Sequence, residues 1–336
     1  MTILAGAGPV INRRVSGEIL MKNWYTFDIG EKPVTEENAL PKISLLTSFD
    51  WQEYELLDSG NGLKLERYGP YRLVRPEPEA IWRQALPEKE WSSAHAVFTP
   101  SPEENGGHWE YHKELPKRWQ MGYKGLKFWT QTTASRHVGV FPEQAGEWDW
   151  IGEQVRSAGR PLHVLNLFGY SGLASLAAAQ AGARVTHVDA SRKVVTWAGE
   201  NLALSGLEDR SVRWIVDDAL KFVQREARRG TGYDGIILDP PKFGRGPKGE
   251  VWEFYRLIPT LLQACKEALN KQPHFIILTA YAVKASSVTL YYALNELMKE
   301  YKGKTEAGEV VLQEKSAGRI LSMAVYASWT SLKKNS

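Results

Sequence analysis

The segment 162–172 constrains the fold of this chain more than any other feature. It begins with the apolar run 162–167 and continues through a glycine-rich turn that ends at Gly172, where an alanine-rich stretch starts. This order predicts a strand that leads into a helix, with glycine allowing the backbone to approach a ligand. Two later apolar runs each end in an acidic residue, Asp189 and Asp239. We therefore expect acidic groups at the carboxyl ends of successive parallel strands, which is where open α/β sheets bind ligands.

Strand and helix patterns alternate from about Thr130 to the end of the chain, so the predicted fold class is α/β with a seven-stranded sheet. The expected strands are 162–167, 183–188, 212–216, 233–238, 275–279, 309–312 and 320–327. A helix is expected over 171–181, closed by a glycine, and another from the N-cap Ser191 to Ser205. The last two strands are expected to form a hairpin around 316–318.

The chain before Thr130 divides into two parts. Residues 1–48 contain scattered apolar positions among many glycines, prolines and charges, which suggests an arm. Residues 49–129 contain short alternating runs, which predict a small β-rich domain. Turn signals separate these runs at 60–62, 69–70 and 106–107. The α/β domain would then comprise 130–336.

Nine of the 13 tryptophans lie between Trp24 and Trp150, before the glycine-rich turn. One interpretation is that they fill the core of the small β-rich domain. The other is that they stack on bases while nearby basic side chains bind phosphates, as on many RNA-binding surfaces. These basic residues are Arg67, Arg72, Arg75, Arg83, Lys117 and Arg118. The two interpretations are compatible, and the sequence leaves both open.

Composition excludes several classes of protein. With 336 residues, 43% hydrophobic positions and a net charge of +3, the chain has length for about two domains, and its charge permits nucleic acid binding without requiring it. One cysteine excludes a disulfide framework and a multi-cysteine zinc site, and the seven histidines show no metal-ligand spacing, so no metal is expected. The first residues lack the pattern of a signal peptide, and no apolar run approaches the roughly 20 residues of a membrane helix, so a cytoplasmic protein is expected.

The order of these motifs resembles that of class I S-adenosylmethionine-dependent methyltransferases, whose fold is a Rossmann-like sheet of seven strands. More narrowly, the segments 166–172, 239–243 and 316–319 resemble the large-subunit ribosomal RNA methyltransferases that modify cytosine C5 or guanine N7. The resemblance covers roughly 130–329, and it implies S-adenosyl-L-methionine as cofactor and RNA as substrate. A dinucleotide dehydrogenase fits less well, because its pyrophosphate turn needs Gly-x-Gly-x-x-Gly and only two relevant glycines occur here.

The resemblance also implies which residues bind the cofactor. Gly169 and Gly172 would shape the methionine pocket, while Asp189 would bind the ribose and Asp218 the adenine. The complete expected set is Phe141, Gln144, Asn166, Phe168, Gly169, Gly172, Asp189, Asp218 and Asp239. Simpler roles compete with these assignments. The glycines would also serve a tight turn, and an acid such as Asp189, Asp217 or Asp218 would also cap the helix that follows it.

Asp239, Pro240 and Phe243 are the expected catalytic residues. Two prolines after Asp239 fix the backbone and remove two N–H donors, which leaves carbonyl and carboxylate oxygens to face a polar substrate edge. Lys242 stands where related amino-methylating enzymes have an aromatic residue, which matches the ribosomal RNA group, and a purely structural turn is the alternative. The flexible loop expected over 244–249 would bind phosphates with its basic side chains while a base is flipped, or would be an ordinary solvated loop.

The chemistry depends on the nucleophile. Cytosine C5 needs a cysteine that adds to C6, and the cytosine-modifying relatives carry it just after the fifth strand, where this chain has 279–281. The single cysteine, Cys265, lies in a helical pattern of leucines that is typical of a core position. We therefore predict methylation of an RNA base, such as guanine N7 or an exocyclic amine, without a cysteine nucleophile. Methylation of a small molecule and a non-catalytic role as an RNA-binding assembly factor are the alternatives.

Overall fold

The computed structural model describes residues 41–48, 50–101 and 106–332. These residues belong to one unit that begins at Pro41, so most of the arm expected over 1–48 lies outside the described residues. The last part of that range differs from an arm, because Ile43–Leu46 forms strand β1 and joins the main sheet. Four residues are too few to give a recognisable alternation of apolar and polar positions.

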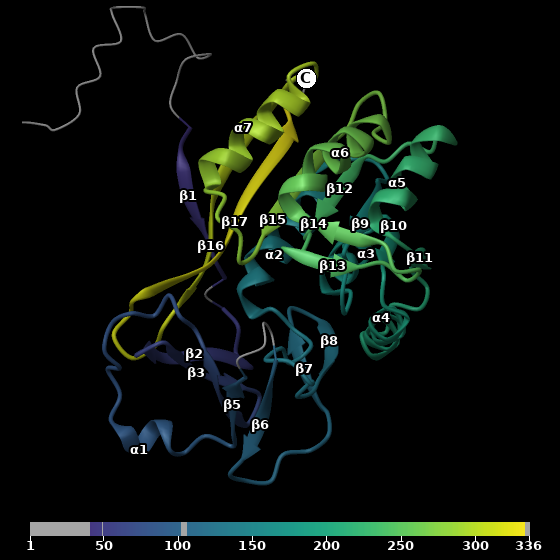
Figure 1. Ribbon diagram of the computed structural model, residues 1–336. Helices are drawn as coiled ribbons and strands as arrows, with labels where there is room; N and C mark the ends of the chain where they lie inside the picture. Colours follow the sequence, from purple (N-terminus) through teal and green to yellow (C-terminus); the bar gives the residue numbers. More distant parts are fainter. Residues whose placement is uncertain (1–40, 49, 102–105, 333–336) are drawn as a thin grey trace, which may run out of the picture. The chain divides into compact units, whose positions relative to one another are not determined.

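The main sheet contains the seven strands expected from the sequence, with β1 as an eighth (Figure 1). Across the sheet the order is β1 (Ile43–Leu46), β16 (Gly303–Gln313), β17 (Ile320–Ser331), β15 (Phe275–Ala280), β12 (Gly235–Leu238), β9 (His163–Leu167), β10 (Arg184–Asp189) and β11 (Val212–Val216). All neighbours are parallel except β17, which is antiparallel to β15 and to β16. The hairpin expected around 316–318 is confirmed. Strand β16 begins six residues before the expected Glu309. The prediction missed this first half because charged residues alternate along it and interrupt the apolar pattern.

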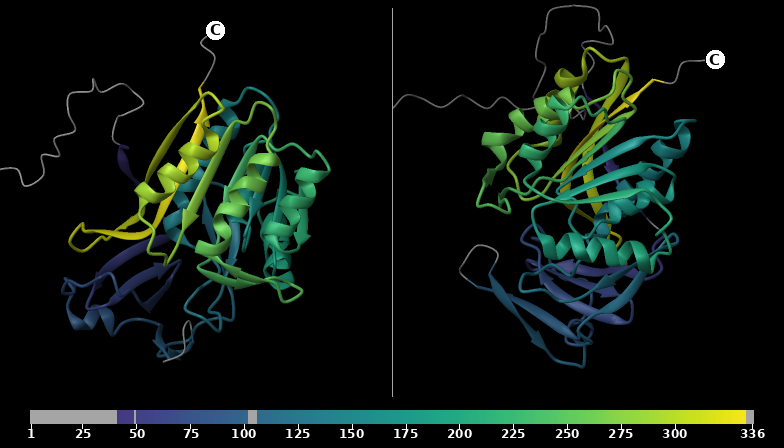
Figure 2. Two further views of the ribbon diagram at one scale, coloured as in Figure 1. Left: turned by 45° about the horizontal axis from the view of Figure 1, so that its top comes forward. Right: turned by 90° about the vertical axis from the view of Figure 1, so that its right-hand side faces the viewer.

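Helices cover both faces of this sheet (Figure 2). One face carries α5 (Ala219–Arg228), α6 (Phe254–Glu267) and α7 (Ser287–Met298), and the other carries α2 (Ala145–Ser157), α3 (Leu173–Gln180) and α4 (Arg192–Leu204). Consecutive residues of β9 show the division, because Leu165 packs with the first group of helices and Val164 packs with α2 and α3. Both helices expected after the glycine-rich turn are confirmed within two residues at each end. None of the helices in the described ranges is long and apolar enough to cross a membrane.

The β-rich part consists of a five-stranded sheet followed by a separate hairpin. The sheet strands are β2 (Tyr54–Gly60), β3 (Leu63–Tyr68), β4 (Tyr71–Pro76), β5 (Ala96–Pro100) and β6 (Gly107–Tyr111), and the hairpin strands are β7 (Trp119–Tyr123) and β8 (Leu126–Thr130). A short helix, α1 (Glu88–Trp91), lies between β4 and β5. The turn signals at 60–62 and 69–70 are confirmed, because they connect β2 to β3 and β3 to β4.

The tryptophans of this region support the core interpretation. The buried ones in the β-rich part are Trp51, Trp91 and Trp119. Most of the arginines considered for RNA binding are held by carboxylates of the protein itself. The ion pairs are Arg67 with Glu55, Arg72 with Glu90, Arg75 with Glu66 and Arg118 with Glu200. These four charges are largely neutralised within the fold, which weakens the interpretation of this region as an RNA-binding surface.

One apolar cluster joins the β-rich part to the helices of the main sheet. It contains Trp51 and Phe128 from the β-rich part together with Leu173 and Leu176 of α3 and Leu202 of α4. Because α3 starts directly after the glycine-rich turn, the β-rich part packs close to the carboxyl ends of the central strands. The expected ligand-binding edge of the sheet therefore lies next to the β-rich part.

Candidate active site

A pocket lies at the carboxyl end of β9. Six of the nine expected cofactor-binding residues line it, namely Phe141, Gln144, Asn166, Phe168, Gly169 and Asp239. The chain brings them together from three places: a short 3-10 helix, η2 (Pro142–Gln144), with the residue before it, the end of β9 with its turn, and the end of β12. Residues that are far apart in the sequence thus form one site, at the sheet edge where the sequence predicted it.

The glycine-rich turn has an unusual backbone. Phe168 and Tyr170 have φ angles of 61° and 47°, a left-handed conformation that residues other than glycine rarely adopt. Such a conformation persists only where the surroundings hold it. The Phe168 ring packs on Trp252 with ring centres 5.0 Å apart, and the N–H of Tyr170 donates to Oδ2 of Asp189 over 3.0 Å. The turn is therefore held from two sides.

The two glycines of the turn are required by packing. A Cβ at Gly169 would lie 2.4 Å from Cε1 of His187. At Gly172, where φ is +89°, a Cβ would lie 2.7 Å from Cβ of Ala198. Glycine is therefore the residue that fits both positions. Both glycines serve the tight turn, and Gly169 also lines the pocket, whereas the contribution of Gly172 to cofactor binding stays a prediction.

Asn166 is fixed beneath the turn by a buried network. Its side-chain amide donates to Oγ of Ser175 over 2.9 Å, and Oγ of Ser175 lies 3.0 Å from Nδ1 of His187. Burial lowers the pKa of His187 to about 3, so the ring is neutral. The network connects β9, α3 and β10 and holds Asn166 in one orientation at the edge of the pocket.

Carboxylic acids dominate the chemistry of the pocket. Nε2 of Gln144 donates to Oδ2 of Asp239 over 2.7 Å, which joins two of the expected residues. Burial raises the pKa of Asp239 to about 7 against the opposing effect of this hydrogen bond, and the charges of Glu143 and Asp189 add to the increase. Near neutral pH this carboxyl is therefore divided between its protonated and ionised forms.

Glu147 is a functional candidate that the sequence analysis missed. It is buried, lines the pocket and accepts a hydrogen bond of 2.6 Å from the hydroxyl of Thr279. Burial raises the pKa of Glu147 to about 8 despite this hydrogen bond, with Asp239 and Glu143 contributing. The available signal was the spacing of Glu143 and Glu147, because residues four apart share a face of a helix.

The acids at the ends of β10 and β11 contact the protein backbone. Asp189 accepts hydrogen bonds from the N–H of Tyr170 over 3.0 Å and from the N–H of Ser191 over 2.8 Å. Asp218 is the N-cap of α5 and accepts from the N–H of Lys221 over 2.8 Å. Asp218 therefore has the helix-capping role that the sequence offered as an alternative. The contacts of Asp189 with ribose and of Asp218 with adenine stay predictions.

The segment after β12 forms a hairpin, so the loop expected over 244–249 is shorter than predicted: residues 244–245 belong to a strand, and 246–249 lie in the turn. Strand β13 (Phe243–Arg245) pairs with β14 (Val251–Glu253) in antiparallel fashion. The buried Trp252 fixes the hairpin, since its Nε1 donates to the carbonyl of Pro241 over 2.6 Å and its ring contacts the glycine-rich turn. A single anchoring tryptophan gives no periodic signal among glycines and basic residues, so the sequence pattern predicted a loop.

The three expected catalytic residues occupy different environments. Asp239 lines the pocket, and Pro240, the next residue, is buried. Phe243 has 54% of its surface exposed and does not line the pocket. The structure thus brings Asp239 to the site and leaves Phe243 on the adjoining surface. Their catalytic roles stay predictions.

The single cysteine has the environment of a core residue. Cys265 is fully buried in α6, and burial raises the pKa of its thiol. The core position expected for it is confirmed. Thr279, at the place where the resembling cytosine-modifying enzymes have a cysteine, donates its hydroxyl to Glu147. In the described part of the chain, no three side chains are grouped in a way that could hold a metal ion.

Comparisons with known proteins identify the family and the fold. The family of S-adenosylmethionine-dependent methyltransferases matches residues 101–278. The crystal structure of a SAM-dependent methyltransferase from Agrobacterium tumefaciens is 46% identical, with a TM-score of 0.83, and the match covers 86% of this chain and 94% of that one. A candidate SAM-dependent methyltransferase from Streptococcus mutans, 17% identical with a TM-score of 0.63, shows the same fold over 84% of this chain and 76% of that one.

Curated relatives include the ribosomal RNA large subunit methyltransferase K/L of Shewanella sp. (strain ANA-3). It is 31% identical over 184 residues, which cover 52% of this chain and 25% of that protein. The chain thus spans about a quarter of the length of the curated relatives it matches. The family match extends over more than half of the chain, and the fold is that of the solved methyltransferase structures. The chain therefore belongs to the S-adenosylmethionine-dependent methyltransferases, and its cofactor is S-adenosyl-L-methionine.

Proposed function

We propose that this protein transfers the methyl group of S-adenosyl-L-methionine to a base of RNA, specifically ribosomal RNA, without a cysteine nucleophile. The observation that carries the proposal is the acidic pocket, where Asp239 lies beside the glycine-rich turn and is followed along the chain by an exposed hairpin. Relatives named as ribosomal RNA methyltransferases support RNA as the substrate. Such a substrate would place the protein in the cytoplasm. Because the chain spans a quarter of those relatives, the base and its position are not carried over from them.

The pocket fits the charge of the cofactor. S-adenosyl-L-methionine carries a sulfonium and an ammonium group, which favour acidic surroundings. Glu147 and Asp239 supply two carboxyl groups to the pocket lining, and Glu143 is a buried acid whose charge acts on both of them. Burial is the main reason that the pKa of each of the three is raised. A bound cation would favour the ionised forms and offset the cost of burying them. The chemistry of these side chains therefore matches the group that the family requires.

Each part of the cofactor has candidate contacts. Where the methionine end would lie, the lining residues are Phe141, Gln144, Asn166, Phe168 and Gly169. Asp189 at the end of β10 would accept hydrogen bonds from the ribose hydroxyls, and Asp218 at the start of α5 would lie beside the adenine. When bound, the cofactor supplies an electrophilic methyl group on its sulfur. The protein has to hold the nucleophile in line with that group.

Direct attack by a nitrogen of the base suits the side chains that are present. Cys265 is buried in α6 and does not line the pocket, so it offers no nucleophile there. Guanine N7 has a free lone pair, and an exocyclic amine needs only a base that takes its proton. Asp239 would accept that proton, because a carboxyl with a pKa of about 7 is matched to neutral pH.

The hairpin beside the pocket supports an unpaired RNA strand as the substrate. Its exposed apolar side chains, and those just after it, are Phe243, Val251 and Tyr255, and the exposed basic ones are Arg245, Lys248 and Arg256. Aromatic rings that stack on bases and cations that bind phosphates are the combination by which proteins hold single strands. Trp252 packs on Phe168, so a strand bound to this hairpin would lie beside the cofactor turn.

The direct test follows a labelled methyl group. Purified protein and methyl-labelled cofactor are incubated with total RNA from cells that lack the gene and, in parallel, with a small-metabolite extract. Label is expected in one ribosomal RNA fragment, to be lost in Asp239→Ala and retained in the matched control Cys265→Ala. Label confined to metabolites would replace RNA with a small-molecule substrate. Label in neither, despite cofactor binding, would favour the non-catalytic assembly role.

A further inference from the structure

The hairpin of β16 and β17 ends in a tip, residues 314–319, that reaches the β-rich sheet (Figure 1). The N–H groups of Lys315 and Ser316 donate to the carbonyls of Leu56 and Leu57 over 2.8 and 3.1 Å, so the tip adds to the backbone of β2. The tip contains 316–319, one of the three motifs that resemble the ribosomal RNA methyltransferases. The proposed function gives this motif no role.

Asp58 of β2 is the centre of this contact. It is fully buried, and donors from both sides of the contact surround its carboxylate. They are the N–H of Ala85 at 3.0 Å, the N–H of Leu86 at 2.8 Å, Nε1 of Trp91 at 3.0 Å, Oγ of Ser316 at 2.7 Å and Nη2 of Arg319 at 3.2 Å. Burial alone would raise the pKa of Asp58, but these hydrogen bonds hold it below its ordinary value. Asp58 is therefore a satisfied, ionised group.

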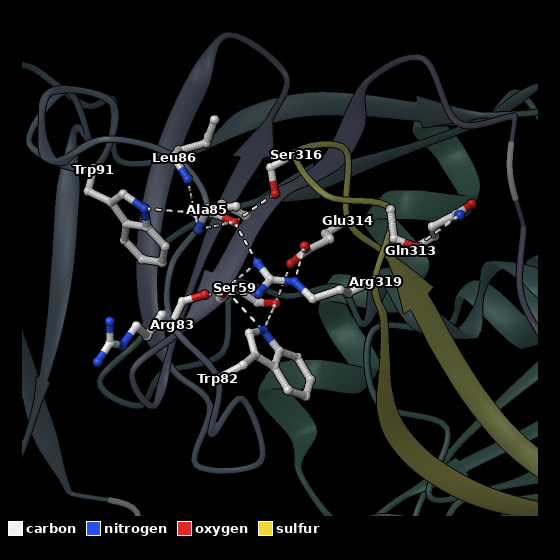
Figure 3. Close-up of polar contacts among 12 residues, drawn as sticks. Ser59, Trp82, Arg83, Ala85, Leu86, Trp91, Gln313, Glu314, Ser316 and Arg319 are labelled. Atoms are coloured by element: carbon white, nitrogen blue, oxygen red, sulfur yellow. Dashed lines mark hydrogen bonds and ion pairs between the residues drawn. The ribbon is translucent and has the colours of Figure 1, made fainter.

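Arg319 supplies the charge that joins the two sides. Its Nε pairs with the buried Glu314, and its Nη1 and Nη2 donate to the carbonyls of Arg83 and Ser59 over 2.8 and 3.2 Å (Figure 3). Oγ of Ser59 donates in turn to Oε2 of Glu314 over 2.5 Å. A planar guanidinium fork suits such divergent acceptors better than an ammonium group. We call this set the hairpin clamp; its members are Asp58, Ser59, Glu314, Ser316 and Arg319.

The β-rich sheet, which the clamp holds, also holds the loop that leads to Phe141 in the pocket lining. Nη1 of Arg75 in β4 donates to the carbonyl of Arg136 over 3.1 Å, and Nε1 of Trp109 in β6 donates to the carbonyl of Thr133 over 2.9 Å. Both acceptors belong to the loop that leads from β8 to Phe141, which lines the pocket. A shift of the β-rich sheet relative to the main sheet would therefore move Phe141.

The other end of the same loop is attached to the cofactor turn. Oγ of Ser171 donates to the carbonyl of Gly139 over 2.6 Å. The loop is thus attached to both parts of the protein, and its shape depends on the distance between them. A buried ion pair contributes little net stability compared with apolar residues, but breaking it is costly, so it favours one geometry. The hairpin clamp, whose acids Asp58 and Glu314 are buried, is therefore suited to fix the distance between the β-rich sheet and the main sheet.

We propose that Arg319 is a positioning residue for the cofactor pocket: through the hairpin clamp it fixes the β-rich sheet at the distance at which Phe141 completes the pocket wall. Arg319 itself does not line the pocket. Its effect passes through the β-rich sheet and the loop held by Arg75.

A double-mutant cycle between Arg319 and Phe141 tests this role. Affinity for S-adenosyl-L-homocysteine is measured by isothermal titration calorimetry on the full chain, so the result does not depend on the nature of the substrate. Arg319→Met and Phe141→Ala are each expected to weaken binding about three- to tenfold. The double variant is expected to bind no more weakly than whichever single variant has the lower affinity. The control Lys315→Met removes an exposed ion pair with Glu55 at the same tip and should bind like the unaltered protein.

A second variant separates a broken clamp from an unfolded chain. Glu314→Gln combined with Arg319→Met removes the cation together with one of its buried acids, while Asp58 keeps four neutral donors. This variant is expected to fold, as shown by near-UV circular dichroism and thermal unfolding, and to bind the ligand as weakly as Arg319→Met. Unchanged affinity in a folded variant without Arg319, or effects of Arg319 and Phe141 that add in full, would overturn the proposal.

Discussion

The pH dependence of cofactor binding is the sharpest test of the acidic pocket. Burial raises the pKa of Asp239 to about 7 and that of Glu147 to about 8. The sulfonium of S-adenosyl-L-methionine interacts favourably with a carboxylate and much less with a neutral acid. Raising the pH through 7 should therefore strengthen binding, because Asp239 is then already ionised in a larger fraction of the protein molecules.

The magnitude follows from the ionised fraction of Asp239. For a pKa near 7, this fraction is about 9% at pH 6 and about 91% at pH 8. If only the ionised form binds the cation, the dissociation constant falls about tenfold between these pH values, or about 1.4 kcal/mol. Glu147 would extend the change towards pH 9, because its pKa is about 8.

The stability of the cofactor-free protein should change in the opposite direction. A carboxyl whose pKa is raised by folding holds its proton more tightly in the folded than in the unfolded state. For Asp239, this stabilisation is complete below the ordinary pKa near 4 and is lost as the pH rises to about 7. The melting temperature without cofactor should therefore fall between pH 5 and pH 8, and added cofactor should reduce that fall.

Calorimetric titrations at pH 6, 7 and 8 with two ligands provide the assay. S-adenosyl-L-homocysteine lacks the sulfonium charge, so its affinity should change less with pH than that of S-adenosyl-L-methionine. Asp239→Asn should remove the step near pH 7 and leave weak binding at every pH. Parallel curves for the two ligands, or an unchanged step in Asp239→Asn, would refute the assignment of Asp239 as the group that senses the cofactor's charge.

Two further predictions concern packing and mechanism. Cys265→Ala should leave the rate of methyl transfer unchanged. It should lower the free energy of unfolding, measured by urea denaturation, by about 1–2 kcal/mol because packing is lost. Loss of methyl transfer in this variant would show that the cysteine takes part in the reaction. Gly169→Ala should cost about 1–3 kcal/mol, because its Cβ would lie 2.4 Å from His187, whereas Gly199→Ala, in open space on α4, should be neutral or stabilise by up to about 1 kcal/mol. Equal effects of the two glycine substitutions would contradict the packing argument.

The central strands and their ends could be predicted because their signals are local. An apolar run predicts a buried strand, and the Gly169, Asp189 or Asp239 that follows it marks the carboxyl end of that strand. The helix boundaries after Gly172 followed from the same kind of signal. These features identified the edge of the sheet where the pocket lies, and the family resemblance supplied the six expected residues that line it.

The features that could not be predicted depend on partners far away in the sequence. Glu147 is an ordinary helix residue until Thr279, 132 positions later, is placed beside it. The hairpin after Pro241 depends on the contact of Trp252 with Phe168, and neither residue reveals the other. Propensity and periodicity describe a residue's neighbours along the chain, so contacts of this kind appear only when the chain is folded.

Strand β1 has a consequence for any shortened form of the protein. It covers 307–310 of β16, and its approach requires Gly308, since a Cβ there would lie 1.8 Å from the carbonyl oxygen of Ser44. Removal of 1–46 would leave that stretch of backbone without a partner, and an uncovered strand edge is a template for pairing with another chain. Gly308→Ala would displace β1 to the same effect. Four residues without a recognisable sequence pattern thus cover a stretch of β16 that a shortened chain would leave open.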